Sequence, residues 1–349
     1  MSEKLLCGVD LGGTKIAIAL VRTDGTIHRQ RQIRDHRGTA PSDVVKRIAA
    51  TVRELARESD LDLRKLQGVG VGTSGHVDYD RGVLIINSNL PGFENFPLGE
   101  SLWDELRVPV YVDNDANAQA WAEYRFGAGR GKPDMAFVTA STGVGAGLIL
   151  GGAIFRGVTG TAGEFGHTIV EPTSSILCGC GRPGCLMAYT SGLTLPLVVR
   201  EMLQHGSRLE DAGLFAGCPA DPQPDLVPDR EAKDATSMMI DFTTLSDNEI
   251  TGELIGEGLE RRDPFCLDVV NQYADYMAIG LHNLYQTINI GHFVLGGGLT
   301  FWGTPYVERI RRRFRFLVES MTTSVPEILL SDLGPHAAVI GAAALPLER

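Results

Sequence analysis

The sequence predicts an α/β protein that contains two similar halves. The segments Cys7–Leu20 and Phe137–Leu150 both read as an apolar strand, a turn of glycine and threonine, and a second apolar strand. A unit that occurs twice indicates two related halves, and we expect their turns to face one shared ligand. In the later part of the chain, helices alternate with strands, as in an α/β layer. Either turn alone leaves another interpretation open, because glycine-rich turns join buried strands in many α/β proteins.

The first thirty residues are expected to form antiparallel hairpins. Turns are predicted at Gly12-Gly13 and at Asp24-Gly25. The segments around these turns are predicted strands: Leu5–Val9, Lys15–Val21 and Thr26–Gln32. A helix is predicted to begin at Pro41, with apolar residues spaced by three or four positions and with Ser42 or Asp43 placed to cap it.

Further strands and helices follow along the chain. Buried strands are expected at Gly68–Gly72, Val108–Val112 and His292–Leu295. Helices are expected at Leu98–Leu106, Ala116–Phe126, Asp268–Thr287 and Ala337–Leu347. Residues 206–247 are rich in proline and acidic residues, so they are predicted to form a surface insertion. The uncharged stretch Ala136–Phe155 is long enough to span a bilayer, but its glycines and hydroxyls favour a hairpin that turns at Gly151-Gly152.

Composition restricts the class of function. The chain has 349 residues, 43% hydrophobic and 21% charged, which is typical of a globular protein with a large core. Its net charge of -11 disfavours binding to nucleic acid or to an anionic membrane, because both need a positive field, so we expect a small-molecule partner. No signal-peptide pattern occurs, and the six cysteines are too few for a disulfide scaffold. We therefore expect a cytoplasmic protein.

Three cysteines and one histidine have the spacing of a zinc site. His167, Cys178, Cys180 and Cys185 can supply four ligands, and the turn residues between the cysteines fold them inward. Four protein ligands leave no open position, so we expect a structural zinc that braces the loop carrying Glu164. A zinc-bound His167 would keep its other N–H oriented toward a substrate hydroxyl. The alternative is a zinc knuckle of purely structural value.

Three glycine-rich turns are candidates for binding a nucleotide. Asp10 ends a buried strand beside Gly12-Gly13-Thr14, where backbone amides can approach phosphate oxygens and a carboxylate can hold a water on Mg²⁺. Thr142-Gly143 would meet the phosphates from the second half, and Gly297-Gly298 would offer a flat surface to adenosine. None of these turns has the Walker A sequence.

Asp113-Asn114-Asp115 follows a predicted strand and precedes a predicted helix. One interpretation is that these residues only cap the helix. The other follows from their position, because ligands bind at the carboxyl ends of strands in open α/β sheets. Asp115 could there accept the proton of a hydroxyl that attacks a γ-phosphate, and Asn114 could both donate to and accept from a polyol.

Five motifs together resemble the ROK family of sugar kinases. They occur in the family's order: Asp10-Leu-Gly-Gly-Thr-Lys15, Asn114-Asp-Ala-Asn117, Glu164-Phe-Gly-His167, Cys178-Gly-Cys-Gly-Arg-Pro-Gly-Cys185 and Gly296-Gly-Gly298. The resemblance covers nearly the whole chain except residues 206–247. It implies an actin-like ATPase fold, also called the hexokinase or ribonuclease-H-like fold, with ATP and a sugar in the cleft between two α/β domains. The small domain would span 1–117 and be completed by 337–349, and the large domain would span 118–336.

The resemblance also assigns roles to residues. Asp115 resembles the catalytic base, and the candidate sugar ligands are Gly75, Asn89, Asn114, Asp115, Glu164 and His167. The candidate contacts of ATP and Mg²⁺ are Asp10, Gly12, Gly13, Thr14, Lys15, Thr142, Gly143, Gly297 and Gly298. One position departs from the family, which usually has glutamate two residues after the last zinc cysteine, where this chain has Met187. A thioether accepts hydrogen bonds only weakly, so the identity of the sugar stays open.

Three activities are compatible with this resemblance. The leading one is an ATP-dependent kinase that phosphorylates the 6-hydroxyl of a hexose, most often glucose. The second is an N-acetylmannosamine or N-acetylglucosamine kinase, and the third is a non-catalytic sugar sensor, which the presence of Asp115 disfavours. Repressors of the family carry a helix-turn-helix domain before the core; this chain begins at the first core strand and is acidic, so we expect no DNA binding. We expect a homodimer or homotetramer.

Overall fold

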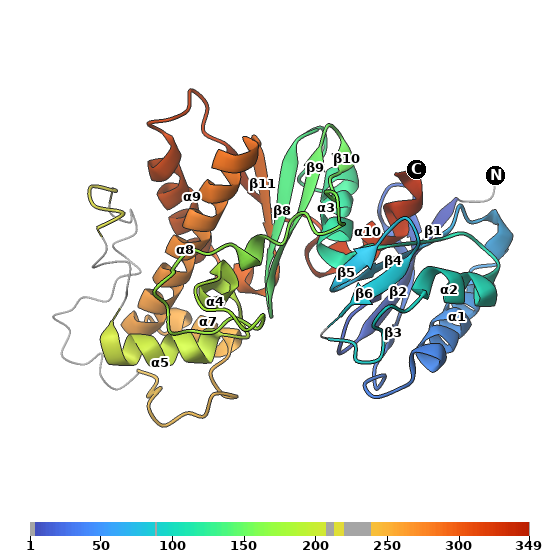
Figure 1. Cartoon of the computed structure of the whole chain (residues 1–349), viewed down its shortest axis with the longest axis horizontal. Coiled ribbons are helices and arrows are strands. Elements are labelled where there is room, and N and C mark those ends of the chain that lie inside the picture. Colours follow the sequence, from blue (N-terminus) through green and yellow to red (C-terminus); the bar gives the residue numbers. More distant parts are fainter. Residues whose placement is uncertain (1–3, 88, 207–212, 220–238, 349) are drawn as a thin grey trace.

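The computed structural model describes residues 4–87, 89–206, 213–219 and 239–348, which form two lobes (Figure 1). The strands of one sheet are β1 (Leu5–Leu11), β2 (Ile16–Arg22), β3 (Ile27–Ile33), β4 (Val69–Thr73) and β7 (Val110–Asn114). Those of the other sheet are β8 (Met135–Ala140), β9 (Val144–Leu150), β10 (Ala153–Ile154), β11 (His292–Gly296) and β12 (Glu327–Leu330). A separate hairpin consists of β5 (His76–Asp78) and β6 (Val83–Ile86).

The two five-stranded sheets have the same topology. Their strand orders are β3-β2-β1-β4-β7 and β10-β9-β8-β11-β12. In each sheet the first three strands pair antiparallel and the last two add in parallel. The predicted α/β fold with two similar halves is therefore confirmed. The apolar stretch Ala136–Phe155 forms the hairpin β8–β9–β10, and no helix of the described residues is long and apolar enough to cross a membrane.

Helices cover both faces of the first sheet. The helices α1 (Pro41–Glu58) and α2 (Leu98–Leu106) bury apolar residues in one core with β1 and β4, whereas α10 (Ala337–Ala344) packs with residues of β1 and β2 in another. A Cβ on Gly70 would lie 1.7 Å from the carbonyl oxygen of Ala342, so the backbone of α10 lies directly on β4. Only glycine permits this approach.

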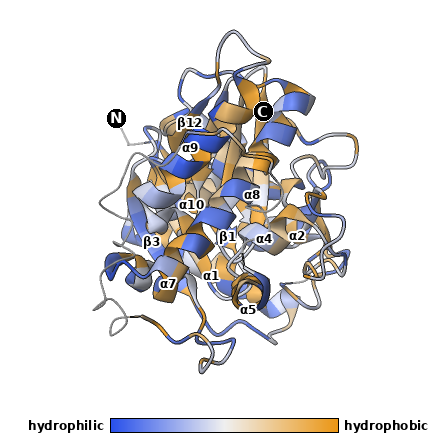
Figure 2. Cartoon of the chain, turned by 90° about the vertical axis from the view of Figure 1, so that its left-hand side faces the viewer, coloured by the Kyte–Doolittle hydropathy of each residue, from blue (hydrophilic) through white to orange (hydrophobic). Residues whose placement is uncertain are grey.

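The second sheet belongs to a lobe with its own set of helices. They are α4 (Leu186–Thr190), α5 (Leu195–His205), α7 (Gly252–Glu260), α8 (Pro264–Ile288) and α9 (Thr304–Val318). Most residues of α8 are buried, so it is the central helix of this lobe. In Figure 2 the ribbon of α9 changes between hydrophilic and hydrophobic colours, as expected for a helix with one buried face.

The helix α3 (Asp115–Phe126) lies between the two sheets (Figure 1). A Cβ on Gly147 of β9 would lie 2.3 Å from the carbonyl oxygen of Ala116, and one on Gly341 of α10 would lie 1.7 Å from that of Ala118. The same turn of α3 therefore touches the second sheet on one side and α10 on the other.

Some predicted boundaries differ from the structure. The N-cap of α1 is Ala40 without a side-chain hydrogen bond, so the prediction that Ser42 or Asp43 caps this helix is wrong. Pro41 takes the first helical position, which moves the cap to the preceding residue. The helix α8 begins at Pro264 rather than Asp268, because the side chain of Asp263 accepts from the first backbone N–H groups.

The predicted insertion at 206–247 is only partly within the described residues, since 207–212 and 220–238 lie outside them. Phe215 is buried, and the guanidinium of Arg313 lies 4.4 Å from the centre of its ring. This contact attaches the described part of the segment to α9.

Candidate active site

The turn between β1 and β2 brings Asp10 and Lys15 together. Burial raises the pKa of Asp10 to about 7, the charge of Asp115 raises it as well, and the charge of Lys15 lowers it. The same turn lies against Asn89, because a Cβ on Gly13 would lie 2.8 Å from the carbonyl oxygen of Asn89. The structure thus places the first predicted phosphate turn beside one of the predicted sugar contacts.

Asn114 and Asp115 lie where β7 ends and α3 begins. Asn114 caps the helix, since its Oδ1 accepts from the N–H of Ala116 at 2.9 Å, and its Nδ2 donates to the carbonyl of Gly75 at 3.1 Å. Capping is therefore a real role of Asn114. Asp115 is the first residue of α3, and its Oδ1 also accepts from Ala116 at 2.9 Å.

Burial raises the pKa of Asp115, and the nearby charge of Glu164 raises it further, while backbone hydrogen bonds lower it. Asp115 also raises the pKa of Asp10, so the carboxylate of Asp115 lies within electrostatic reach of both Asp10 and Glu164. Groups far apart in the sequence thus converge at one place. A carboxylate whose pKa is raised in this way is a stronger base than an ordinary carboxylate.

The loop that carries Glu164 rests on β9. Gly163 has φ +89°, and a Cβ there would lie 2.1 Å from the carbonyl oxygen of Ala146, so only glycine allows the loop to come this close. Glu164 is half-exposed, and its Oε2 lies 3.7 Å from Nε2 of His167. Both side chains are thus available to a ligand.

The four predicted zinc ligands form one cluster. The ligand atoms of His167, Cys178, Cys180 and Cys185 all lie within 4.8 Å of one another. Nδ1 of His167 lies 3.6 Å from Sγ of Cys178, and the Sγ atoms of Cys180 and Cys185 lie 3.7 Å apart. A tetrahedral zinc would place two sulfurs about 3.8 Å apart and a sulfur and a nitrogen about 3.6 Å apart, given its usual bond lengths. The cluster therefore fits zinc, with Nε2 of His167 left to face Glu164.

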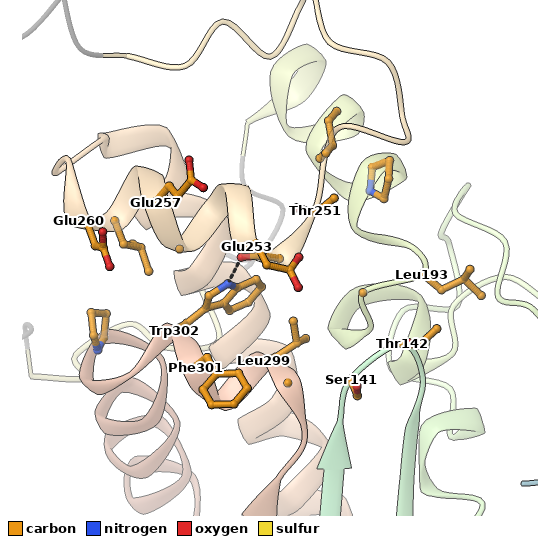
Figure 3. A pocket seen from close by; sticks show the side chains of 18 of the residues that line it. Ser141, Thr142, Leu193, Thr251, Glu253, Glu257, Glu260, Leu299, Phe301 and Trp302 are labelled. Atoms are coloured by element: carbon orange, nitrogen blue, oxygen red, sulfur yellow. Dashed lines mark hydrogen bonds between the residues drawn. The ribbon is translucent and has the colours of Figure 1, made fainter. Parts of the chain in front are cut away.

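A cavity of about 1040 Å³ lies beside the second turn, between α7 and the segment that follows β11 (Figure 3). Ser141 and Thr142 line it at the tip of the β8–β9 hairpin, and their carbonyls accept from the backbone N–H groups of Gly192 and Leu193. Figure 3 shows Phe301 and Leu299 on the opposite side from α7. Phe301 is 83% exposed, which leaves its ring free to contact a flat ligand.

Some of the predicted nucleotide-binding residues line this cavity and others do not. Thr142 and Gly298 line the cavity, whereas Gly143 and Gly297 are not among the residues that line it. Gly297 has φ +92°, and a Cβ there would lie 2.3 Å from the carbonyl oxygen of Ala140, so this glycine permits the approach of two backbones. The turn Gly12–Lys15 is not among the residues that line the cavity, but lies with Asp10 near Asp115.

Sequence reasoning missed the acidic side of this cavity. The described lining includes four carboxylates and neither lysine nor arginine; they belong to Asp247, Glu253, Glu257 and Glu260. In Figure 3 the glutamates project from α7, which is fixed to the opposite wall because Nε1 of Trp302 donates to the carbonyl of Gly252 at 2.8 Å. The only sequence signal was helical periodicity that resumes near Ile250, and periodicity does not show which side of a helix lines a cavity.

The duplicated sheets and the two turns define a protein of the actin-like ATPase fold. The chain belongs to the ROK family, whose model matches residues 6–349. The glucokinase of Streptomyces coelicolor is 32% identical over 345 residues, which is 99% of this chain and 98% of that protein. An N-acetylmannosamine kinase of Shigella boydii is 38% identical over 185 residues, which is 53% of this chain and 60% of that protein.

Solved structures agree with this assignment. The crystal structure of a ROK family glucokinase from Streptomyces griseus, in complex with glucose and AMPPNP, superposes with a TM-score of 0.74 at 31% identity, and the match covers 98% of both chains. A ROK hexokinase from Thermus thermophilus superposes with a TM-score of 0.75 at 28% identity, covering 98% of this chain and 97% of that one.

Proposed function

We propose that the protein is an ATP-dependent hexose kinase that transfers the γ-phosphoryl group of ATP to the 6-hydroxyl of glucose. The observation that carries this proposal is the position of Asp115. Its carboxylate has a raised pKa at the carboxyl end of β7, within electrostatic reach of both Asp10 at the phosphate turn and Glu164 in the predicted sugar loop. The full-length similarity to glucokinases supports the same activity.

In this proposal Asp115 accepts the proton of the sugar hydroxyl as that oxygen attacks the γ-phosphorus. Asn114, Glu164 and His167 orient the sugar, together with Gly75 and Asn89. Asp10 holds a water of Mg²⁺, which would neutralise charge on the phosphates when bound. The carboxylate chemistry of Asp10 fits this cation, and Lys15 lies close enough to lower the pKa of Asp10.

The cavity beside Thr142 is the proposed site of the nucleoside. Its carboxylates can accept hydrogen bonds from ribose hydroxyls and from the adenine amino group, and Phe301 can stack on the base. A polyphosphate chain would meet only repulsion from these four carboxylates. ATP is therefore the proposed donor rather than polyphosphate.

Zinc is proposed to act through the loop that it braces. When bound to the four ligands, the metal would fix the ring of His167 and hold the segment from Glu164 to Cys185 in one conformation. This chain's own contribution is the Nε2 atom of His167, which is left to contact a sugar hydroxyl.

A second candidate is an N-acetylhexosamine kinase. Met187 favours it, because the thioether offers an apolar contact where the family usually has a carboxylate. The similarity to an N-acetylmannosamine kinase over 185 residues supports this alternative for that part of the chain. A non-catalytic sensor is the third, and it would lack any use for a base at Asp115.

The discriminating experiment measures ADP release with glucose, mannose, glucosamine, N-acetylglucosamine and N-acetylmannosamine, together with ³¹P analysis of the product. Highest kcat/KM for glucose and a 6-phosphate product are expected. A preference for an N-acetylhexosamine would select the second candidate, and no turnover with any sugar despite sugar binding would select the sensor.

We further propose the domain division 1–117 with 337–349 and 118–336, which the packing of α10 on β1 and β4 supports. A cytoplasmic location is proposed because all six cysteines are free thiols, and the three cysteines of the metal site need a reducing compartment to stay reduced. A homodimer or homotetramer is the proposed assembly, and size-exclusion chromatography with light scattering measures it.

A further inference from the structure

We propose that His36 and Arg37 are positioning residues that hold the turn Gly12–Thr14 in the conformation that binds the terminal phosphates of the nucleotide. The proposal rests on the kinase activity proposed above, because it assigns these two side chains to the phosphate turn of that same site. Neither residue belongs to the five motifs that resemble the ROK family.

Both residues lie in the loop between β3 and α1, and both contact carbonyl groups of the turn. Nε2 of His36 lies 2.8 Å from the carbonyl oxygen of Gly12, and Nε of Arg37 lies 3.1 Å from that of Gly13. A carbonyl oxygen can only accept, so the hydrogen of the neutral imidazole must be on Nε2. Two consecutive carbonyls of the turn are thus held by side chains of another segment.

The imidazole makes this one hydrogen bond and no other within the described residues. His36 is 3% exposed, and its Nδ1 is buried without a hydrogen-bond partner among them. Burial of a polar ring is costly, and within the described residues the bond to Gly12 is the side-chain hydrogen bond that offsets this cost. The bond to Gly12 is therefore what gives this histidine its position.

Because His36 and Arg37 hold two carbonyl groups of the turn, they also fix the directions of the N–H groups that follow those carbonyls. In a trans peptide the C=O and the following N–H point in opposite directions, so the N–H groups of Gly13 and Thr14 point away from His36 and Arg37. Within the part of the chain that the structure describes, neither N–H donates to an acceptor. Two adjacent free amides that point the same way form a concave site for an anion.

A glycine pair needs such external support. Peptides next to glycine rotate readily, and rotation of the Gly12–Gly13 or Gly13–Thr14 peptide would turn a carbonyl toward the phosphate and remove a donor. The supporting loop is itself held by α1, because Arg47 donates to the carbonyls of Arg34 at 3.0 Å and Asp35 at 3.2 Å.

The position of the turn indicates which phosphates it meets. The nucleoside cavity is lined by residues of the second sheet's lobe, such as Thr142 and Gly298, whereas the turn Gly12–Thr14 lies with Asp10 near Asp115. The amides of Gly13 and Thr14 are therefore directed to the phosphates nearest the acceptor hydroxyl. Loss of their orientation should weaken binding of a triphosphate and leave a monophosphate unaffected.

The test uses Arg37→Ala, His36→Leu and His36→Gln in the full-length, zinc-loaded protein with Mg²⁺. The Kd values of AMPPNP, AMP and glucose are measured by calorimetry. Arg37→Ala and His36→Leu should each raise the Kd of AMPPNP about five- to tenfold, which is the size expected for the loss of one hydrogen bond that orders the turn. The Kd values of AMP and glucose should stay within about twofold of wild type. His36→Gln should retain most of the affinity, because its amide nitrogen can reach the same carbonyl.

Arg34→Ala is the matched control, since Arg34 is exposed in the same loop and, among the described residues, its guanidinium donates only to Gln32. It should change none of the three Kd values. Equal weakening of AMP and AMPPNP, or unchanged AMPPNP affinity in folded Arg37→Ala, would overturn the proposal. Arg37 is exposed, so this variant remains informative if His36→Leu does not fold. Failure of the proposed kinase activity would appear separately, as absence of turnover in the wild type.

Discussion

Arg156 and Asp113 join the two lobes beside the proposed base. Nε of Arg156, which follows β10, donates to Oδ2 of Asp113 at the end of β7 at 2.8 Å. Oδ1 of Asp113 accepts from the N–H of Asn114 at 2.7 Å and from Nδ2 of Asn117 at 2.9 Å. The residue that precedes Asn114-Asp115 is therefore tied to the segment that leads to Glu164.

The same guanidinium also pairs with Glu348 and lies 4.4 Å from the centre of the Tyr79 ring. We expect Arg156→Met to lower kcat at least about tenfold, because Asp115 and Glu164 lose their common support, and to destabilise the fold by about 3 to 5 kcal/mol by leaving buried carboxylates unpaired. Steady-state kinetics and urea unfolding measure the two effects. Arg81→Met is the control, since Arg81 pairs with Asp78 in the open on the β5–β6 hairpin. Unchanged kcat in the folded variant would mean that the lobes are aligned without this pair.

Asp115→Asn tests the proposed base. We expect kcat to fall on the order of 10²-fold or more while the Kd of AMPPNP changes little, since a proton acceptor acts only in the transition state. Asp43→Asn is the matched control, because Asp43 is also an acidic residue in the first turn of a helix. If Asp115 only stabilised α3, both substitutions would cost similar small amounts of stability and turnover would persist.

The raised pKa of Asp10 predicts that nucleotide binding depends on pH. Its raised pKa of about 7 means that the group is largely protonated below that pH and becomes a carboxylate as pH rises. The carboxylate is the form that holds a water of Mg²⁺, so the affinity for MgAMPPNP should increase between about pH 6 and pH 8. Asp10→Asn should bind more weakly and flatten this profile. A profile that stays as steep in Asp10→Asn would assign the titration to another group.

Zinc content and sugar binding should fall together in Cys180→Ser. The wild type is expected to hold about one zinc per chain in the four-ligand site, and loss of one thiolate should lower the metal content and release the ring of His167. Elemental analysis and the Kd of glucose provide the measurements. Cys218→Ser is the control, because Cys218 lies outside the cluster. Wild-type protein that contains no zinc after purification without chelator would refute the assignment.

Met187 lies among the three segments that meet at the proposed sugar site. Its Cβ would lie 3.3 Å from a Cβ on Gly166, its Sδ 3.6 Å from one on Gly143, and its Cε 3.7 Å from one on Gly179. Met187→Glu should lower KM for glucose about tenfold, which is the effect expected of one charge-assisted hydrogen bond. The kcat should be nearly unchanged, because this contact is remote from the phosphoryl group. Met187→Gln, similar in size but neutral, should have a smaller effect. An unchanged or raised KM in a folded, zinc-loaded variant would show that position 187 does not contact the sugar.

The elements fixed by local chemistry could be predicted from the sequence. The hairpins β1–β2 and β8–β9 follow from apolar runs that flank glycine turns, and the cluster of His167 with three cysteines follows from their spacing within about twenty residues. The predicted cap of α1 is wrong because Pro41 takes the first helical position and so makes Ala40 the cap, which outweighs the intrinsic preference of Ser42 and Asp43 for this role.

What could not be predicted depends on contacts between distant segments. The glutamates of α7 line a cavity only because the helix is held against Trp302, and His36 is buried only because the loop before α1 folds onto Gly12. A histidine between charged residues reads as an exposed loop residue in any local pattern. The same holds for Arg156, whose partners lie 43 and 192 positions away along the chain.

The packing of α10 on Gly8 and Gly70 has a consequence for how the chain folds as it is made. The strands β1 and β4 are synthesised early, yet the helix that covers their glycine-lined face is formed by residues 337–344. Until those residues have left the ribosome, the N-terminal sheet has one apolar face without its native cover. A newly made N-terminal half therefore has to wait for the last helix, and during that wait its exposed strands are a target for chaperones and for aggregation.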